Sequence, residues 1–585
     1  MKKRFIAQVI SGTILLLGFL TVKPSFGQPI LPDGTNSDDG SGTNGSYYPT
    51  DPPLVITYPT NAVLKWALNM SYGTPLVSSL SLAPDGTLYS VNQEYLSAIN
   101  TSVVDTNDPS YPSQNDFTKW VANRGYWYGS GTTPAIGVDG TIYSSTDGIT
   151  FSAIDPANGT NLWDFTATTT ASVFGGAQPA IGADGTVYIS GDAFVPSINP
   201  SSEISLFYAL TNAFGTTNYY SNTNLYSNPL VGLGIKWIFV ITNGGQLFSG
   251  AAPAIGRDGT IYVNELNSIV ELNNTDTFGT GLFALNPTNG ILLWQTSPLN
   301  SLPLSQQTMT GRGATGAAIG PDGTVYYGMG TNFVAINPNA PVTNGVMGFK
   351  WIYSNPAISF AWRPVVGSDG TIYVEANTST ISYGSYPASI IETNWLFAFD
   401  PTTGTPKWTA SLSSTNYYGV NWKIGSLAIA ADGEIILADA DGTLYSFAPS
   451  GQTNWTYQTG PQALGSPLIG PDGTIYVESI DGDGITCYVY ALAGVSPIAC
   501  ASWPEDGRNA RRTATVVNAS LSSPMMTPNS FQVTITGPTN MPVCLGATED
   551  FVVWTNLGQT ILAGGSTNFV DTNVIGYRFY RAFPQ

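Results

Sequence analysis

The sequence predicts an all-β protein built from eight similar units, because two short motifs alternate along most of its 585 residues. The first motif is seen most clearly at residues 253–263, where an Asp-Gly pair lies between two β-rich runs. A hairpin whose turn needs a residue with positive φ has this signature. The Asp residues of the eight copies are Asp85, Asp139, Asp184, Asp258, Asp322, Asp369, Asp432 and Asp472.

The second motif is a Trp that precedes each Asp-Gly pair. In the clearest copies, such as residues 284–294, this Trp closes a second hairpin, so that each unit has four strands. Antiparallel four-stranded units of roughly 40 to 50 residues, arranged radially, form a β-propeller. We therefore predict an eight-bladed β-propeller of four-stranded antiparallel blades at residues 61–518. The eight Trp residues are Trp66, Trp120, Trp163, Trp237, Trp294, Trp351, Trp408 and Trp455.

The two ends of the predicted propeller are expected to meet in the last blade. Residues 62–68 contain a Trp strand that no Asp-Gly hairpin precedes. This strand is available to complete the last blade, which would close the ring. Insertions of uneven length separate the motifs, and the largest, at about residues 212–234, is expected either to carry function or to cover a blade edge.

The spacing Ala-x-Asp-Pro-x-x-Gly-x-x-x-Trp after Asp-Gly-Thr-x-Tyr resembles the PQQ-like (quinoprotein-type) propeller repeat of exported bacterial proteins. The resemblance covers about residues 60–515, and residues 502–513 resemble the closing segment of such propellers. It implies that each repeat Trp docks one blade against the next, which gives the eight Trp a structural role. The motif predicts the fold rather than an activity.

The resemblance also implies a way to hold a cofactor, which this sequence does not match. PQQ enzymes of the family use a pair of adjacent Cys, a channel Trp and a calcium ion held by carboxylate and amide groups. The three Cys here (Cys487, Cys500 and Cys544) are not adjacent to one another. We therefore assign no catalytic residue, no metal ligand and no cofactor, and PQQ and calcium are unsupported.

The regions outside the propeller have distinct compositions. Residues 1–27 combine a basic start with an apolar run and small residues, which predicts a signal peptide and a secreted, periplasmic or cell-surface protein. Residues 28–60 predict a flexible leader. Residues 519–529 predict a linker, and residues 530–585 alternate as the strands of a small C-terminal β module with a role in adhesion or display.

Composition limits the classes of function. With 19 Lys and Arg against 38 Asp and Glu, the net charge is -19, so a nucleic-acid partner is not expected. The chain has no His, which removes the Ser-His triad and the commonest zinc ligand. Beyond the signal, no apolar stretch is long enough to span a membrane, and we expect a monomer. Export would allow one disulfide, between Cys487 and Cys500.

A candidate ligand site lies where the chain enters the inner strands, at the mouth of the central channel. Aromatic walls with one Arg would suit a planar or sugar-like ligand, although aromatic residues at these positions also pack blades together. The expected lining residues are Tyr128, Phe174, Phe248, Arg312, Trp362 and Trp422.

Three functions compete at this point. The first is an exported, non-catalytic binding or interaction scaffold for a protein, glycan or small ligand, which the full repeat frame without a catalytic constellation favours. The second is a PQQ-dependent quinoprotein dehydrogenase with an altered cofactor pocket. The third is a polysaccharide-acting enzyme that uses paired carboxylates.

Overall fold

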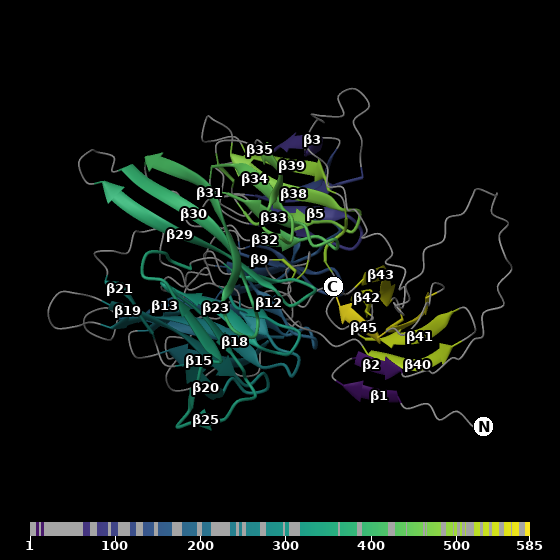
Figure 1. Ribbon diagram of the computed structural model, residues 1–585, viewed down its shortest axis with the longest axis horizontal. Coiled ribbons are helices and arrows are strands. Elements are labelled where there is room, and N and C mark those ends of the chain that lie inside the picture. The colour runs from purple at the N-terminus through teal and green to yellow at the C-terminus, as the bar shows by residue number, and fades with distance from the viewer. Residues whose placement is uncertain are drawn as a thin grey trace, which may run out of the picture.

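The computed structural model consists of β-strands joined by turns and loops (Figure 1). The all-β fold of antiparallel, four-stranded sheets is therefore confirmed. In the part of the chain that the structure describes, no helix has the length and apolar character needed to cross a membrane. The structure describes residues 7–10, 13–16, 62–70, 79–91, 95–102, 117–123, 133–145, 150–166, 178–195, 202–211, 234–241, 245–247, 253–269, 277–296, 299–303, 316–360, 363–382, 389–418, 427–439, 441–459, 462–463, 465–480, 487–494, 496–499, 504–505, 509, 520–526, 530–537, 541–548, 555–562, 564–571 and 579–584.

Eight sheets among the described strands repeat one arrangement, in which four strands follow from an inner to an outer edge. Unit 1 contains β4 (Ser81–Leu82), β5 (Thr87–Val91), β6 (Tyr95–Asn100) and β7 (Thr118–Asn123). Unit 2 contains β8 (Ala135–Ile136), β9 (Ile142–Ser144), β10 (Thr150–Ile154) and β11 (Asn161–Thr166). Unit 3 contains β12 (Ala180–Ile181), β13 (Val187–Val195), β14 (Ser202–Leu210) and β15 (Ile235–Ile241). Unit 4 contains β17 (Ala254–Ile255), β18 (Ile261–Ile269), β19 (Thr277–Leu285) and β20 (Leu292–Thr296).

The second half of the propeller continues the pattern. Unit 5 contains β22 (Ala318–Ile319), β23 (Val325–Met329), β24 (Asn332–Ile336) and β27 (Trp351–Ser354). Unit 6 contains β28 (Val365–Val366), β29 (Ile372–Ser382), β30 (Ser389–Phe399) and β31 (Pro406–Tyr418). Unit 7 contains β32 (Leu427–Ile429), β33 (Ile435–Ala438), β34 (Thr443–Phe447) and β35 (Thr453–Gln458). Unit 8 contains β37 (Leu468–Ile469), β38 (Thr474–Ile480), β39 (Cys487–Ala493) and β3 (Val63–Asn69).

Short added strands enlarge two of these sheets. The sheet of unit 4 also takes in β16 (Gly245–Leu247), β21 (Leu299–Pro303), β25 (Val342–Thr343) and β26 (Val346–Met347). The hairpin of β25 and β26 comes from unit 5 and pairs in parallel with β20, the outer strand of unit 4. The sheet of unit 8 gains β36 (Gln462–Ala463).

The N-terminal Trp strand completes the last unit. β3 pairs with β39 in antiparallel register, with Leu68 opposite Val489. This pairing joins residues near the two ends of the propeller, as expected from the isolated Trp strand at residues 62–68. The inner strands β22, β28, β32 and β37 of units 5 to 8 contact one another in order, as inner strands around a propeller axis do. That the ring has eight blades stays a prediction.

The C-terminal module consists of two small sheets beside the propeller (Figure 1). β40 (Ser520–Met526), β41 (Phe531–Thr536) and β44 (Ser566–Asp571) form one sheet. β42 (Met541–Thr548), β43 (Thr555–Leu562) and β45 (Phe579–Pro584) belong to the other. Apolar residues of both sheets pack together as one core: Leu521, Phe531, Val533, Ile535, Val543, Leu545, Ala547, Leu562 and Tyr580.

The structure contains strands in two segments for which the sequence analysis predicted none. β40 lies within the predicted linker 519–529; it is an edge strand, and its pairing with β41 shifts register between Ser522 and Met525, where a Pro in the sequence is tolerated. Within the predicted signal peptide, β1 (Ala7–Ile10) pairs with β2 (Thr13–Leu16), and β2 pairs with β45. The export signal itself stays a prediction. The leader 28–60 and residues 212–233 of the large insertion lie outside the described residues.

Each Asp-Gly turn forms in the same way. In unit 1, the backbone N–H of Gly86 donates to the Ala83 carbonyl, and the Ala83 N–H donates to the Thr87 carbonyl. Gly86 has a φ of 83°, which only Gly adopts without strain. The Asp85 carboxylate accepts a 2.9 Å hydrogen bond from the Thr87 N–H. The Asp side chain thus fixes the turn, and the Gly alone takes the left-handed conformation.

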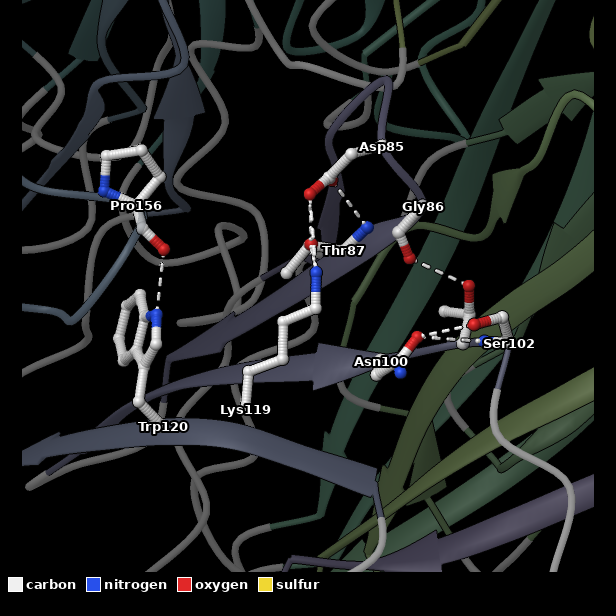
Figure 2. Close-up of polar contacts among 9 residues, drawn as sticks. Asp85, Gly86, Thr87, Asn100, Ser102, Lys119, Trp120 and Pro156 are labelled. Atoms are coloured by element: carbon white, nitrogen blue, oxygen red, sulfur yellow. Dashed lines mark hydrogen bonds and ion pairs between the residues drawn. The ribbon is translucent and has the colours of Figure 1, made fainter.

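A Lys on the outer strand reinforces this turn in several units. In unit 1, Lys119 lies 3.3 Å from the Asp85 carboxylate and also contacts the Thr87 hydroxyl (Figure 2). Partial burial disfavours the ionised carboxyl, but the Thr87 hydrogen bonds and the Lys119 ammonium outweigh it, so the pKa of Asp85 lies below its ordinary value. The corresponding pairs in other units are Lys65 with Asp472, Lys236 with Asp184, Lys350 with Asp322 and Lys407 with Asp369.

The repeat Trp residues join neighbouring units. The Trp120 indole N–H of unit 1 donates a 2.8 Å hydrogen bond to the Pro156 carbonyl of unit 2 (Figure 2). Trp237, Trp351 and Trp408 make the same bond to Pro287, Pro401 and Pro449 of the next unit. Trp120 and Trp408 are partly exposed, and the other six repeat Trp are buried. The blade-docking role that the family resemblance implies is confirmed at these four joints.

Candidate functional site

The six residues predicted to line the channel mouth lie outside the described residues. They are Tyr128, Phe174, Phe248, Arg312, Trp362 and Trp422. Their assignment to a ligand site stays a prediction. Phe360, an aromatic residue of the same face, is fully buried and packs on Phe333 and Phe397. At this position, packing between units is the role that the structure supports.

A ring of polar side chains lies where the chain enters the inner strands. The backbone N–H of Ser466 in unit 8 donates a 3.0 Å hydrogen bond to the Ser79 hydroxyl of unit 1. The Ser79 N–H in turn donates a 3.0 Å bond to the Thr133 hydroxyl of unit 2. All three residues are buried. Equivalent residues of successive units are thereby linked around the inner ring.

The ring also contains a contact between units that are not neighbours. Arg363, which directly precedes the inner strand region of unit 6, donates a 2.5 Å hydrogen bond to the fully buried Gln178 of unit 3. Units 4 and 5 lie between them in the chain, so this contact joins the inner edges of two units that are not sequence neighbours. In the sequence, the equivalent residues of these intervening units are the small Ala252 and Gly316.

Arg363 and Gln178 were missed by the sequence analysis, which named Arg312 as the channel Arg. An alignment of the repeats on their Asp-Gly pairs would have found them, because each lies six residues before its Asp. Guanidinium, amide and hydroxyl groups recognise polar or anionic ligands. Because the pKa of a guanidinium is far above neutral pH, Arg363 is suited to binding rather than to proton transfer.

The chain that follows the last unit runs along the channel edge of unit 7. The Pro497 carbonyl accepts a 2.7 Å hydrogen bond from the Ala431 N–H, and the Ala499 N–H donates a 2.7 Å bond to the Ile429 carbonyl. The Pro504 carbonyl accepts a 2.9 Å bond from the Ile429 N–H. Since β32 is the inner strand of its sheet, this segment occupies channel space beside unit 7.

Two buried carboxylates of unit 7 are part of the frame. Glu434 accepts a 3.0 Å hydrogen bond from the Trp455 indole N–H and another from the Ser446 hydroxyl. Burial raises the pKa of Glu434, although these hydrogen bonds oppose the shift. Asp439 accepts a 2.7 Å bond from the Asn394 amide. These groups hold neighbouring strands and units together.

An apolar strip is exposed on the outer strands of units 4 and 5. Ile291 is 61% exposed and Leu293 is 44% exposed, at the start of the outer strand of unit 4. In other units a Lys that pairs with the turn Asp takes the place of Leu293. Leu292, Val342 on β25 and Ile352 on β27 are exposed as well.

Residues 279–511 match the PQQ_2 family model, which is described as outer membrane protein assembly factor BamB. The chain contains a PQQ-like β-propeller. No curated protein matches the sequence.

The PQQ-like propeller also resembles solved structures. Quinohemoprotein alcohol dehydrogenase from Comamonas testosteroni shares 13% identity, with 75% of this chain and 77% of that chain covered and a TM-score of 0.48. BamB from Moraxella catarrhalis shares 12% identity, with 74% and 97% covered and a TM-score of 0.32. The C-terminal WD40 domain of Sif2 shares 10% identity, with 74% and 99% covered and a TM-score of 0.43.

The described residues of the PQQ-like propeller do not fit the cofactor arrangement of the quinone enzymes. Cys487, the cysteine whose side chain the structure describes, is buried on β39 between units 8 and 1. Its thiol is free, so the structure does not contain the bridge to Cys500 that export would allow. A thiol in this joint cannot supply a pair of adjacent cysteines in the channel.

Proposed function

We propose that the protein is an exported, non-catalytic propeller that binds a partner protein through the outer strands of units 4 and 5. The alternative is that the scaffold binds a glycan or a small ligand in the channel. The polar groups of the inner ring already connect units, and the buried Glu434 carboxylate connects strands within unit 7. In this proposal, the partner protein therefore binds to the outer surface and not to the inner ring.

The exposed apolar strip carries the proposal. Ile291, Leu292 and Leu293 follow one another on one outer edge, and Val342 lies on the hairpin that extends the same sheet. Contiguous exposed apolar patches on a protein surface mark sites of interaction with other proteins. On the outer strands of five other units, the position equivalent to Leu293 carries a Lys that pairs with the turn Asp.

Two further observations support the proposal. The matched family model bears the description of an assembly factor, which is a protein that acts on other proteins. The basic and apolar residues 2–20 have the composition of an export signal. Together they favour an exported interaction scaffold of periplasmic, secreted or cell-surface location.

A photo-crosslinking amino acid at position 291 tests the proposed surface in the cell that makes the protein. We expect one discrete adduct with another protein from this position. Val63, which is 58% exposed on the outer strand of unit 8, is the control position. Replacing Ile291 by Asp should then weaken binding of the purified adduct partner at least tenfold. The same adducts from both positions, or none from position 291, would contradict the proposal.

The enzymatic alternatives have their own tests. Calorimetry with PQQ and calcium measures whether the purified protein binds the cofactor of a quinoprotein dehydrogenase, and we expect no heat of binding. A screen of alcohols, aldehydes and polysaccharides measures turnover directly. If the purified protein converts any of these substrates and a matched inactive preparation does not, the protein is an enzyme and the non-catalytic proposal is wrong.

A further inference from the structure

The joint between the last and the first unit has an apolar core with one carboxyl group in it. β3 contributes Trp66, Leu68 and Met70 to this core. Unit 1 contributes Leu80, Leu82, Leu88, Ile99 and Phe117, and unit 8 contributes Leu468, Tyr476, Cys487, Val489 and Ala491. Glu478 lies on β38 beside these residues and is 3% exposed.

Glu478 faces unit 1 across this joint. Tyr476, two residues earlier on the same strand, belongs to the core of the joint, whereas Val477 packs toward unit 7. Alternation along a strand therefore directs Glu478 toward unit 1. There, the Ser90 hydroxyl of β5 donates a hydrogen bond to the Glu478 carboxyl. This contact connects residues of the first and last units directly.

The surroundings of Glu478 offer no cation among the described side chains of this core. Its titratable neighbours there are Tyr476 on the same strand and Cys487 on β39, and unit 1 presents Leu88 and Ser90. Burial raises the pKa of Glu478 to about 8, and the Ser90 hydrogen bond only partly opposes this shift. In such a place the ionised carboxylate is strongly disfavoured relative to the neutral carboxyl group.

We propose that Glu478 is a pH-sensitive latch, which holds the joint between units 8 and 1 closed when it is protonated and lets the joint open more readily as the pH rises. An apolar residue would fill the same space without this dependence. The joint is also where the chain ends of the propeller meet, through β3 and β39. Because the chain runs from β3 into unit 1, the pairing of β3 with β39 beside this joint is where the ring is closed by strand pairing and not by the covalent chain.

Proton linkage gives the direction and size of the effect. The carboxyl is neutral in the closed joint and ionises at ordinary pH once the joint opens. Opening therefore releases one proton between the pKa of an exposed Glu and that of the buried group. Over this range, the opening equilibrium rises about tenfold for each pH unit. Above the buried pKa, the dependence levels off.

Alkylation of Cys487 measures opening of the joint, because the Cys487 thiol is free and buried in it. The full-length protein is treated with N-ethylmaleimide, and peptide mass spectrometry reports the rate at Cys487 alone. The Glu478→Gln variant serves as the reference at each pH, because its thiol has the same intrinsic reactivity once the joint is open. The readout is the ratio of the wild-type rate to the variant rate.

We expect this ratio to rise about 100-fold between about pH 5.5 and pH 7.5, which is tenfold per unit. Ser90→Ala should raise the Cys487 rate at every pH and keep the same slope, since the carboxyl remains. The hydrogen-exchange protection factors of β18 and β19 in unit 4, which are corrected for the intrinsic pH dependence of amide exchange, should stay unchanged over this range. A flat ratio would overturn the proposal, and so would protection factors in unit 4 that fall as Cys487 labelling rises.

Discussion

The Gly that ends an Asp-Pro-x-x-Gly or Asn-Pro-x-x-Gly turn is required by the neighbouring unit as well as by its own backbone. Gly290 has a φ of 70°, and a Cβ added to it would lie 2.5 Å from the Trp237 indole. The same Gly therefore allows the turn of unit 4 to form and leaves room for the Trp of unit 3. This double constraint explains why the Trp and the Gly recur together in the sequence.

Replacing Gly290 by Ala separates these two requirements. We expect a loss of about 2 to 4 kcal/mol in the free energy of unfolding, from left-handed backbone strain together with overpacking against Trp237. Gly323 is a matched control, because its φ is 84° and no atom lies within 4 Å of an added Cβ. Gly323→Ala should lose only about 1 to 2 kcal/mol. Denaturant unfolding of both variants checks this, and equal losses would contradict the packing argument.

Leu293 occupies the place that Lys takes in five other units. The acceptor turn is intact, since the Thr260 hydroxyl donates a 2.8 Å hydrogen bond to the Asp258 carboxylate. Leu293→Lys should add the missing pair and stabilise the protein by about 0.2 to 1 kcal/mol at low salt, as exposed pairs do. Leu293→Met is the control without charge. A gain that does not diminish as salt increases would mean that no ion pair forms.

At the scale of single residues, the sequence analysis identified the residues that recur from unit to unit and missed the residues that differ between units. The eight Asp-Gly turns and the repeat Trp were visible because each motif recurs in a constant chemical form. Arg363 and Gln178 differ from the Ser and Thr at equivalent positions, and their contact joins residues 185 apart. An alignment of the repeats locates both positions, but no local pattern shows that these two side chains meet, because their contact depends on how distant units are arranged.

Among the elements, the outer strands connect the units through their Trp side chains. Trp351 is buried, and its indole N–H donates a 3.0 Å hydrogen bond to the Pro401 carbonyl of unit 6. Trp408 makes the equivalent 2.8 Å bond to Pro449 but remains partly exposed. The two joints thus share one hydrogen bond and differ in the apolar surface that they bury.

Truncation of these two Trp residues measures the contribution of packing to a joint. Trp351→Ala should cost about 3 to 5 kcal/mol, as is typical of a buried Trp. Trp351→Phe keeps most of the ring and should lose about 0.5 to 1.5 kcal/mol for the hydrogen bond. Trp408→Ala should cost less than Trp351→Ala. Thermal and denaturant unfolding provide the values, and a reversed order of the two Ala variants would contradict the account.

The elements that the sequence did not predict depend on contacts between distant segments. The β25–β26 hairpin pairs with β20 of the preceding unit, and residues 497–499 pair with unit 7. Both are short and gain their hydrogen bonds from an existing sheet edge. β40 was hidden by its Ser, Pro and Met content, which is typical of a linker. Strand propensity alone does not reveal strands of these kinds.

For the whole molecule, the decisive contact is the one between its distant ends. Leu64 lies opposite Leu492, and Val63 lies opposite Ala493. Without this pairing, unit 8 would lack its outer strand and the apolar core of the joint would lose Trp66, Leu68 and Met70. The all-β propeller and this closing strand could be predicted from the order of the motifs, since one Trp strand at the start had no hairpin of its own.

A designed disulfide between β3 and β39 tests this closure most directly. In a variant without the three native cysteines, Val63→Cys and Ala493→Cys should form an intramolecular disulfide, because directly opposite residues of an antiparallel pair lie within disulfide reach. Val63→Cys with Ala491→Cys is the register control, since Ala491 lies two residues from Ala493 on β39, about 7 Å farther along the strand.

Mass spectrometry of the non-reduced, digested protein measures which peptides are joined. We expect the peptides that contain positions 63 and 493 to be linked within one chain, with folding and melting temperature preserved, and we expect no such link in the control pair. An absent link, a link between different chains only, or equal yields from both pairs would contradict closure of the propeller by its N-terminal strand.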